Sequence, residues 1–157
     1  MGLYIYLKVL HVIAATMFFG TGLGSAFYKL RADLSGKTED IVFAQKNIVL
    51  ADWLFTVPSG VVLPVTGLWM AELAGFPIAS GWMFWGLILY GVAGACWLPA
   101  AVLQIRMRDE AIRAFAERRP LAGRYVTWSR IWLLLGIPAF AAAVITIFLM
   151  VAKAVPW

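Results

Sequence analysis

Four long apolar runs, separated by short polar stretches, constrain this chain more than any other feature of its sequence. The runs cover about residues 3–28, 48–73, 81–103 and 131–152. Crossing the roughly 30 Å hydrocarbon layer of a bilayer as a helix takes about 20 such residues. Hydrophobic residues make up 63% of the chain and charged residues only 13%, which leaves little water-facing surface. We therefore predict an all-α fold, a four-helix transmembrane bundle that forms one integral membrane domain over residues 1–157.

The basic residues predict how the bundle is oriented. Of the 13 Lys and Arg residues, four lie within 29–47 and seven within 104–130, whereas Lys8 and Lys153 lie near the other side. The positive-inside rule places both charged connections in the cytoplasm. Both termini then face outward in a bacterial cytoplasmic (inner) membrane. Because the charges gather in two loops, the net charge of +5 indicates topology and not a nucleic-acid partner.

Glycines and prolines inside the runs predict how the helices pack. Gly20 and Gly24 form a GxxxG pattern, which lets two helix backbones approach closely, and we expect it to pack inside the bundle. A weaker version recurs in the third run, at Gly86, Gly91 and Gly94. Pro58 and Pro64 each remove a backbone hydrogen bond from the second run. We expect kinks there, and a kink can open a cavity or free a carbonyl for a ligand.

Four ionisable residues lie in or beside the runs. Burying such a residue in hydrocarbon is costly, so each is a candidate for a functional role. Glu72 is expected to reach the headgroups at the outer end of the second run. Asp52 enters the same run only slightly from the cytoplasmic side. We expect Asp52 to form an ion pair, with Arg130, Arg106 or Lys29 as its partner.

His11, the only histidine, is the deepest of the four. It lies ~12 Å along the helix from Leu3, well inside the hydrocarbon. Lys8 shares its face and can extend outward to water, which the shorter imidazole cannot do. Groups at a similar depth on the other runs include Thr66, Tyr90 and Thr146. A polar pocket around His11 is therefore predicted.

Three interpretations of this pocket are open: a histidine that only satisfies a neighbouring hydroxyl or carbonyl, a ligand of haem iron, or a site of proton or metal chemistry. One copy of this chain cannot supply two histidine ligands, because it contains a single histidine. A haem b would be five-coordinate, be shared across a dimer, or take a second ligand from Met70, Met83 or Lys8.

The sequence contains no CxxC, no HExxH and no phosphate-binding glycine loop. Cys96 is alone, so an intrachain disulfide is excluded.

The stretches LKVLHVIAATMFFGTGLG, DWLFTVPSGVVLPVTGLWM and WLPAAVLQIRMR resemble a family of small bacterial integral membrane proteins grouped as a domain of unknown function (DUF 2269). The resemblance covers essentially the whole chain and implies the four-span layout. More distantly, His11 followed by Phe18, Phe19 and Gly20 is similar to the first span of HemJ-type protoporphyrinogen oxidases and of CopD-type copper-resistance membrane domains. The former resemblance implies that His11 is a haem ligand and that the protein is a membrane oxidoreductase. HemJ-type proteins carry a second histidine soon after the first span, where this chain reads AFYKLRADLSG.

The leading hypothesis is a small membrane protein that binds a b-type haem or a porphyrin, for electron transfer or porphyrin oxidation. His11 would be the axial ligand, Lys8 would face a propionate, and Thr66 and Tyr90 would line the pocket. The alternative is a non-enzymatic membrane subunit or assembly partner, whose glycine faces bind another chain. The expected partners are membrane lipids and either a second copy or a larger membrane complex. A third class, proton-coupled transport through Asp52 and His11, would have to join groups at opposite depths.

Overall fold

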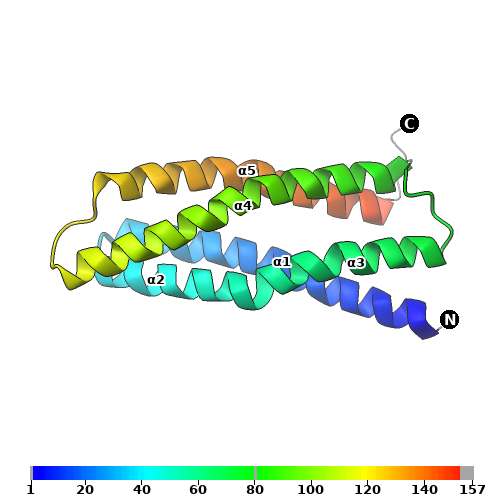
Figure 1. Cartoon of the computed structure of the whole chain (residues 1–157), viewed down its shortest axis with the longest axis horizontal. Coiled ribbons are helices and arrows are strands. Elements are labelled where there is room, and N and C mark those ends of the chain that lie inside the picture. The colour runs from blue at the N-terminus through cyan, green and yellow to red at the C-terminus, as the bar shows by residue number, and fades with distance from the viewer. Residues whose placement is uncertain (1, 80, 153–157) are drawn as a thin grey trace.

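The computed structural model describes residues 2–79 and 81–152, which are helical apart from short connections. Its elements in chain order are α1 (Gly2–Ser35), α2 (Thr38–Ala51), η1 (Asp52–Thr56), α3 (Val57–Leu73), α4 (Gly81–Ala116) and α5 (Gly123–Ala152). The second to fourth of these join into one helix of 36 residues (Figure 1). The described residues therefore contain four helices that are long and apolar enough to cross a membrane. The predicted all-α, four-helix architecture is confirmed.

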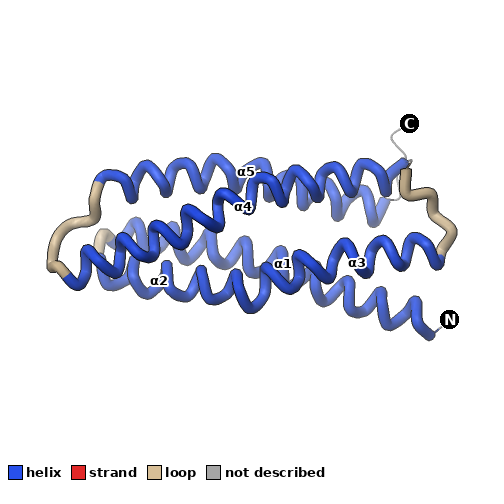
Figure 2. The backbone as a smooth tube through the Cα atoms, viewed as in Figure 1, coloured by secondary structure: helices blue, strands red, loops and turns tan. Residues whose placement is uncertain are grey.

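The four helices lie side by side along the long axis of the molecule, and their ends gather in two groups (Figure 2). The α1–α2 and α4–α5 connections lie at one end. The start of α1, the α3–α4 connection and the end of α5 lie at the other. Lys153, which the sequence assigns to this second end, lies outside the described residues.

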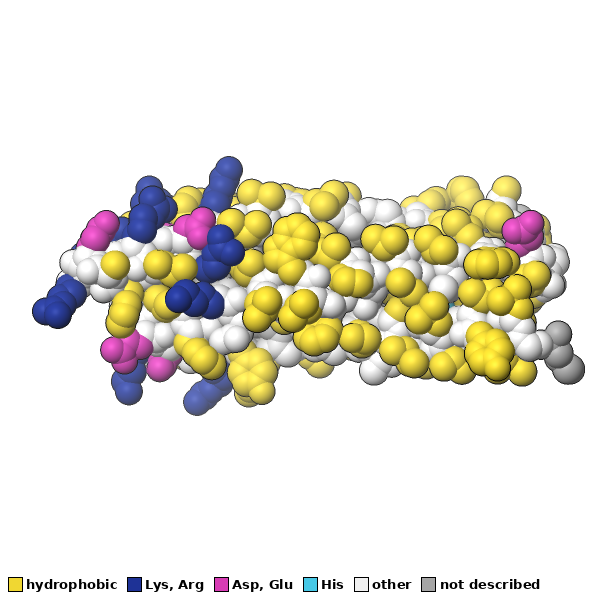
Figure 3. Space-filling view, turned by 60° about the horizontal axis from the view of Figure 1, so that its bottom comes forward, with side chains coloured by type: hydrophobic (Ala, Val, Ile, Leu, Met, Phe, Trp, Pro, Cys, Tyr) yellow, Lys and Arg dark blue, Asp and Glu magenta, His cyan; other side chains and the backbone are white. Residues whose placement is uncertain are grey.

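Charged side chains cluster at the first end, which we call the charged end (residues 29–47 and 104–130), and apolar side chains cover the middle (Figure 3). Only 17–28% of the most apolar window of each span is buried within the chain. Most of each span therefore faces outward, as is expected where lipid tails cover the apolar side chains.

The buried core lies toward the charged end, where the helices continue beyond the apolar runs. There α4, which packs along α5, also packs against α2. The core cluster consists of Ala32, Ile41, Ala44, Ile48, Leu103, Met107, Ala111 and Tyr125. Alanine is frequent in it because small side chains let helices approach closely.

The transition from α2 to α3 is a π-turn, and Pro58 gives a physical reason for it. The backbone N–H of Val57 donates to the carbonyl of Asp52, five residues back, where an α-helix would bond to the fourth. A proline has no N–H, and its ring would clash with the carbonyl four residues before it. One wider turn just ahead of Pro58 relieves that clash without breaking the helix. The distortion expected from this proline is thus a local change of helix type.

The first helical residue of α2 is Thr38. Lys37 holds the cap position with an extended backbone and no side-chain cap hydrogen bond. Glu39 and Asp40 lie in the first turn, where carboxylates are favourable near the partial positive charge of a helix start.

Glu110 fastens the connection between α4 and α5. Its carboxylate is fully buried and accepts hydrogen bonds from Arg119 at 2.8 Å, from Arg124 at 2.5 Å and from the N–H of Ala122 at 3.3 Å. It lies about 43 Å along α4 from Gly81, beyond the hydrocarbon layer. The hydrogen bond from Arg119, helped by that from Arg124, holds the pKa of Glu110 at about 2. The Glu110 carboxylate therefore stays ionised at physiological pH.

A buried polar network links three helices at the charged end. Lys29 on α1 is only 3% exposed, and its Nζ lies 2.5 Å from Asp33 Oδ2 and 2.5 Å from Ser129 Oγ on α5. The Tyr125 hydroxyl donates to Asp33 Oδ1 at 2.6 Å and accepts from Gln45 Nε2 on α2 at 3.0 Å. The Lys29 ammonium also faces the rings of Tyr125 and Trp132, at 5.6 and 5.4 Å from their centroids. We call Lys29, Asp33, Gln45, Tyr125 and Ser129 the Lys29 network.

We predict that Lys29→Met destabilises the protein by about 3 kcal/mol, because it leaves the Asp33 charge without its buried partner. Unfolding in detergent, followed by circular dichroism, measures the change. Arg31→Gln is the matched control, since this neighbouring cation is exposed and makes no ion pair with a described residue. The double variant Lys29→Met/Asp33→Asn should lose less than the sum of the single changes. Equal stability of Lys29→Met and the unaltered protein would contradict the importance of this network.

Candidate functional site

His11 on α1 meets Thr66 on α3 inside the apolar part of the bundle. The imidazole Nδ1 lies 2.8 Å from the hydroxyl oxygen of Thr66, so the structure brings together two residues that were matched by depth alone. Gly67 makes the approach possible. A Cβ atom at that position would lie 3.3 Å from His11 Cε1, which is tighter than ordinary contact. The half-buried ring therefore lies against the backbone of α3.

The partners of Thr66 determine which nitrogen of His11 carries the proton. The Thr66 hydroxyl donates its single proton to the carbonyl of Val62, at 2.7 Å. With the proton placed so, the hydroxyl accepts from His11, which assigns the ring hydrogen to Nδ1 and leaves Nε2 with a free lone pair. A histidine that binds a metal through one nitrogen commonly donates its other N–H to a neighbouring acceptor in this way. The backbone carbonyl of Leu63 also interacts with this ring, and no side chain among the described residues is hydrogen-bonded to Nε2.

Lys8 lies one turn before His11 on α1, as the sequence indicates. Its side chain is exposed and makes no hydrogen bond or ion pair with another described residue. The structure therefore leaves the ammonium group free to meet a charged group from outside the chain.

Tyr90 has a partner of its own on α3. Its hydroxyl donates to the carbonyl of Gly60. Gly60 stands four residues before Pro64, which has no N–H to bond that carbonyl, so Tyr90 satisfies a group that the proline leaves free. Neither Tyr90 nor Thr146 is hydrogen-bonded to His11 among the described residues: the Thr146 hydroxyl donates to the carbonyl of Ala142 on its own helix.

An apolar groove of about 250 Å³ lies beside Tyr90, toward the charged end from His11. Phe18, Tyr90 and Trp97 form its aromatic walls, and Gly60 and Gly94 leave room between them. Pockets that enclose a small organic ligand usually measure about 300–1,000 Å³. His11 does not line this groove, so the groove does not place a ring system against the imidazole.

Asp52 does not form the expected ion pair. It is buried, and its Oδ1 accepts from the Thr56 hydroxyl at 2.7 Å. The side chain of Gln104 on α4 also interacts with the carboxylate, although Oδ2 makes no close hydrogen bond with a described residue. The prediction fails because Lys29 pairs with Asp33, four residues along its own helix, and because Arg106 and Arg130 are exposed.

Asp52 and Thr66, which the sequence analysis singled out separately, belong to one row of buried polar residues on the helix that contains α2 and α3. Sequence reasoning missed the other members of this row, Gln45, Thr56 and Ser59. The spacing of three, four or seven positions within the row keeps its members on one face of a helix, so the pattern could have been found in the sequence. The interior of this bundle is thus more polar than its lipid-facing surface.

The GxxxG glycines do not pack inside the bundle as expected. A Cβ atom added at Gly20 or Gly24 would meet nothing within 4 Å, and the same holds for Gly91 and Gly94 on α4. Of the predicted set, only at Gly86 would an added Cβ atom meet another helix, with the Thr146 methyl group 4.0 Å away. The open face of α1 around Gly20 and Gly24 is therefore available to a partner outside this chain.

A family model described as predicted integral membrane protein (DUF2269) matches residues 5–154, which include His11, Thr66 and both charged connections. No curated protein and no solved structure matches the chain. The likeness of the first span to HemJ-type and CopD-type proteins stays a prediction.

The hydrogen bond from Tyr90 to the Gly60 carbonyl gives Tyr90 a structural role that can be tested apart from any role in binding. Tyr90→Phe should destabilise the protein by about 1 kcal/mol, since it leaves the Gly60 carbonyl unsatisfied. In a Pro64→Ala background the restored N–H can bond that carbonyl, so the same change should cost much less. Unfolding in detergent of the two single variants and the double variant measures this coupling. Additive effects would contradict the link between Tyr90 and Pro64.

Proposed function

The chain belongs to the family of predicted integral membrane proteins (DUF2269), and from that premise we propose that it binds a b-type haem or a related porphyrin through His11. The single observation that supports this is the hydrogen bond of His11 Nδ1 to Thr66, which leaves Nε2 free to hold an iron ion. Electron transfer or porphyrin oxidation is the proposed use. The charged end is proposed to face the cytoplasm of a bacterium, with His11 nearer the outer surface.

The chain's own residues divide the work in this proposal. His11 holds the iron, and Thr66 fixes the orientation and the tautomer of the ring. Lys8 is free to neutralise a propionate near the outer surface. A bound haem would supply one-electron chemistry. Tyr90, held at Gly60, stays a predicted lining residue.

The described residues are better suited to supply an axial ligand for haem iron than to enclose the haem ring. The described residues contain no group of three or more His, Cys, Asp or Glu side chains that could hold a metal ion, so a bare ion is poorly served. The groove beside Tyr90 does not include His11. A planar ring would therefore lie partly against lipid or a second molecule. The iron would be five-coordinate, be shared with a second copy, or take Met70, Met83 or Lys8 as its second ligand.

The absorption spectrum of the purified protein tests the proposal. Protein from haem-supplemented cells should show a Soret band that His11→Ala abolishes. Thr66→Val should weaken haem binding by about 10–100-fold, because the ring loses its orienting partner. Thr16→Val is the matched control, since that hydroxyl bonds only to Val12 on its own helix. The absence of a Soret band, or a band unchanged in His11→Ala, would rule out this function.

A second candidate function is that of a non-enzymatic membrane subunit or assembly partner. The observation that favours it is the open face around Gly20 and Gly24. Small residues at positions i and i+4 let a second helix approach the backbone closely, and such packing drives association where lipid weakens apolar attraction. The partner in this case is a second copy or another membrane protein.

We expect Gly20→Leu and Gly24→Leu to abolish association while leaving the fold intact, because no described residue occupies that space. Gly91→Leu, at an equally open position on α4, is the control. Cross-linking in native membranes, followed by light scattering in mild detergent, measures the association. A protein that stays monomeric in both measurements, with no cross-linked species, would count against this function.

A further inference from the structure

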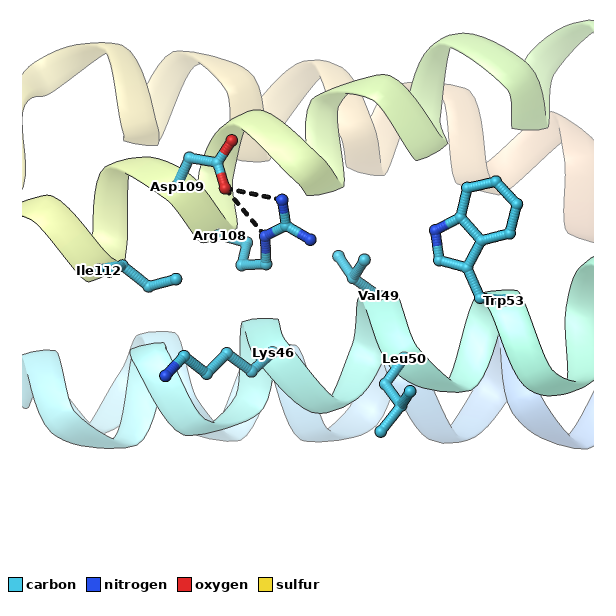
Figure 4. A pocket seen from close by; sticks show the side chains of 7 residues that line it. All are labelled: Lys46, Val49, Leu50, Trp53, Arg108, Asp109 and Ile112. Atoms are coloured by element: carbon cyan, nitrogen blue, oxygen red, sulfur yellow. Dashed lines mark hydrogen bonds and ion pairs between the residues drawn. The ribbon is translucent and has the colours of Figure 1, made fainter.

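A groove between α2 and α4 opens at the charged end and is separate from the His11 site. Its volume is about 430 Å³. Lys46 from α2 and Arg108 from α4 bring cations to it from two helices (Figure 4). Val49 and Ile112 line it between them, and Leu50 on α2 and Trp53 on η1 extend it along the second helix. The groove thus combines a charged part with an apolar part.

The position of these residues along the helices matches the layers of a membrane. Trp53 lies ~30 Å along the helix from Leu73, at the boundary of a hydrocarbon layer that begins near that residue. Lys46 lies about 10 Å farther on, and counting along α4 from Gly81 places Arg108 at about the same distance beyond the boundary. The two cations therefore lie at headgroup level. Trp53 lies where tryptophans gather at membrane surfaces.

The charges of the groove leave capacity for one anionic group. Lys46 makes no ion pair with a described residue. Arg108 is held by Asp109, which accepts from its Nε at 2.9 Å and lies 2.8 Å from one terminal nitrogen, so the other terminal nitrogen is unpaired. Figure 4 shows the guanidinium directed into the space between the two helices. With Asp109 counted, the three groups keep one net positive charge.

We propose that this groove binds the headgroup of an anionic glycerophospholipid. The phosphate lies between Lys46 and Arg108, and the first part of the acyl chains lies on Leu50 and Trp53, which are 54% and 62% exposed. Basic pockets between membrane helices are suited to such headgroups. A free phosphate ion would use the two cations but gain nothing from the apolar wall. The lipid would join the helix that contains α2 and α3 to the α4–α5 pair.

Thermal unfolding and native mass spectrometry of the purified chain test the proposal, with phosphatidylglycerol, phosphatidylcholine and inorganic phosphate as the three probes. Phosphatidylglycerol should raise the Tm and remain bound in the gas phase, and the other two should not. Lys46→Gln and Arg108→Gln should each weaken phosphatidylglycerol binding about fivefold. Lys37→Gln and Arg130→Gln change the net charge equally, at exposed positions outside the groove, and should leave binding unchanged.

Each other outcome overturns the proposal. Equal losses in the groove and control variants would mean attraction by net charge alone. Equal stabilisation by inorganic phosphate would identify a free-anion site, and equal binding of phosphatidylcholine would remove the need for a net negative charge. Lys46 is exposed and unpaired, so Lys46→Gln remains informative even if Arg108→Gln fails to fold.

Discussion

The need to satisfy every backbone hydrogen-bonding group without water governs the second span, and the candidate site follows from it. Pro58 and Pro64 each remove a donor from this helix. A π-turn accommodates the first, and the Tyr90 hydroxyl bonds the carbonyl that the second leaves free. The same span contains Thr66, whose hydroxyl donates to its own helix at Val62, and this arrangement makes it the acceptor of the His11 Nδ1–H. A backbone contact in α3 thus assigns the tautomer of a side chain on α1.

The two ends of the molecule are held together by different kinds of contact. At the charged end, buried ions are paired, as Glu110 is with Arg119 and Arg124 and as Lys29 is with Asp33. These contacts connect helices where they extend past the apolar runs, and the buried core lies in the same region. Toward the opposite end the helices rely on neutral contacts such as that of His11 with Thr66. That half of the bundle is consequently held by fewer strong interactions.

The sequence predicts the elements well because hydrophobic length and the positions of proline and glycine are local signals. Depth along a helix also identified Thr66 as a partner of His11, since both residues are counted from the same membrane boundary. The choice among partners at one depth is not local, as Asp52 shows: its bond to Thr56 is a contact four residues along its own helix, whereas the arrangement of the helices leaves Arg106 exposed. The contact of Gln45 with Tyr125 joins residues 80 positions apart, and no spacing rule predicts it.

The two proposed uses of α1 depend on opposite faces of that helix. Each residue advances about 100° around an α-helix, so Gly20 and Gly24 lie roughly 180° and 220° away from His11. His11 faces α3, and the glycines face away from the bundle. A second copy that packs on the glycines would therefore not bring its own histidine to His11 Nε2. Haem binding and association through α1 are independent properties, and a haem shared between two copies would require a different interface, nearer the groove that Phe18 and Tyr90 line.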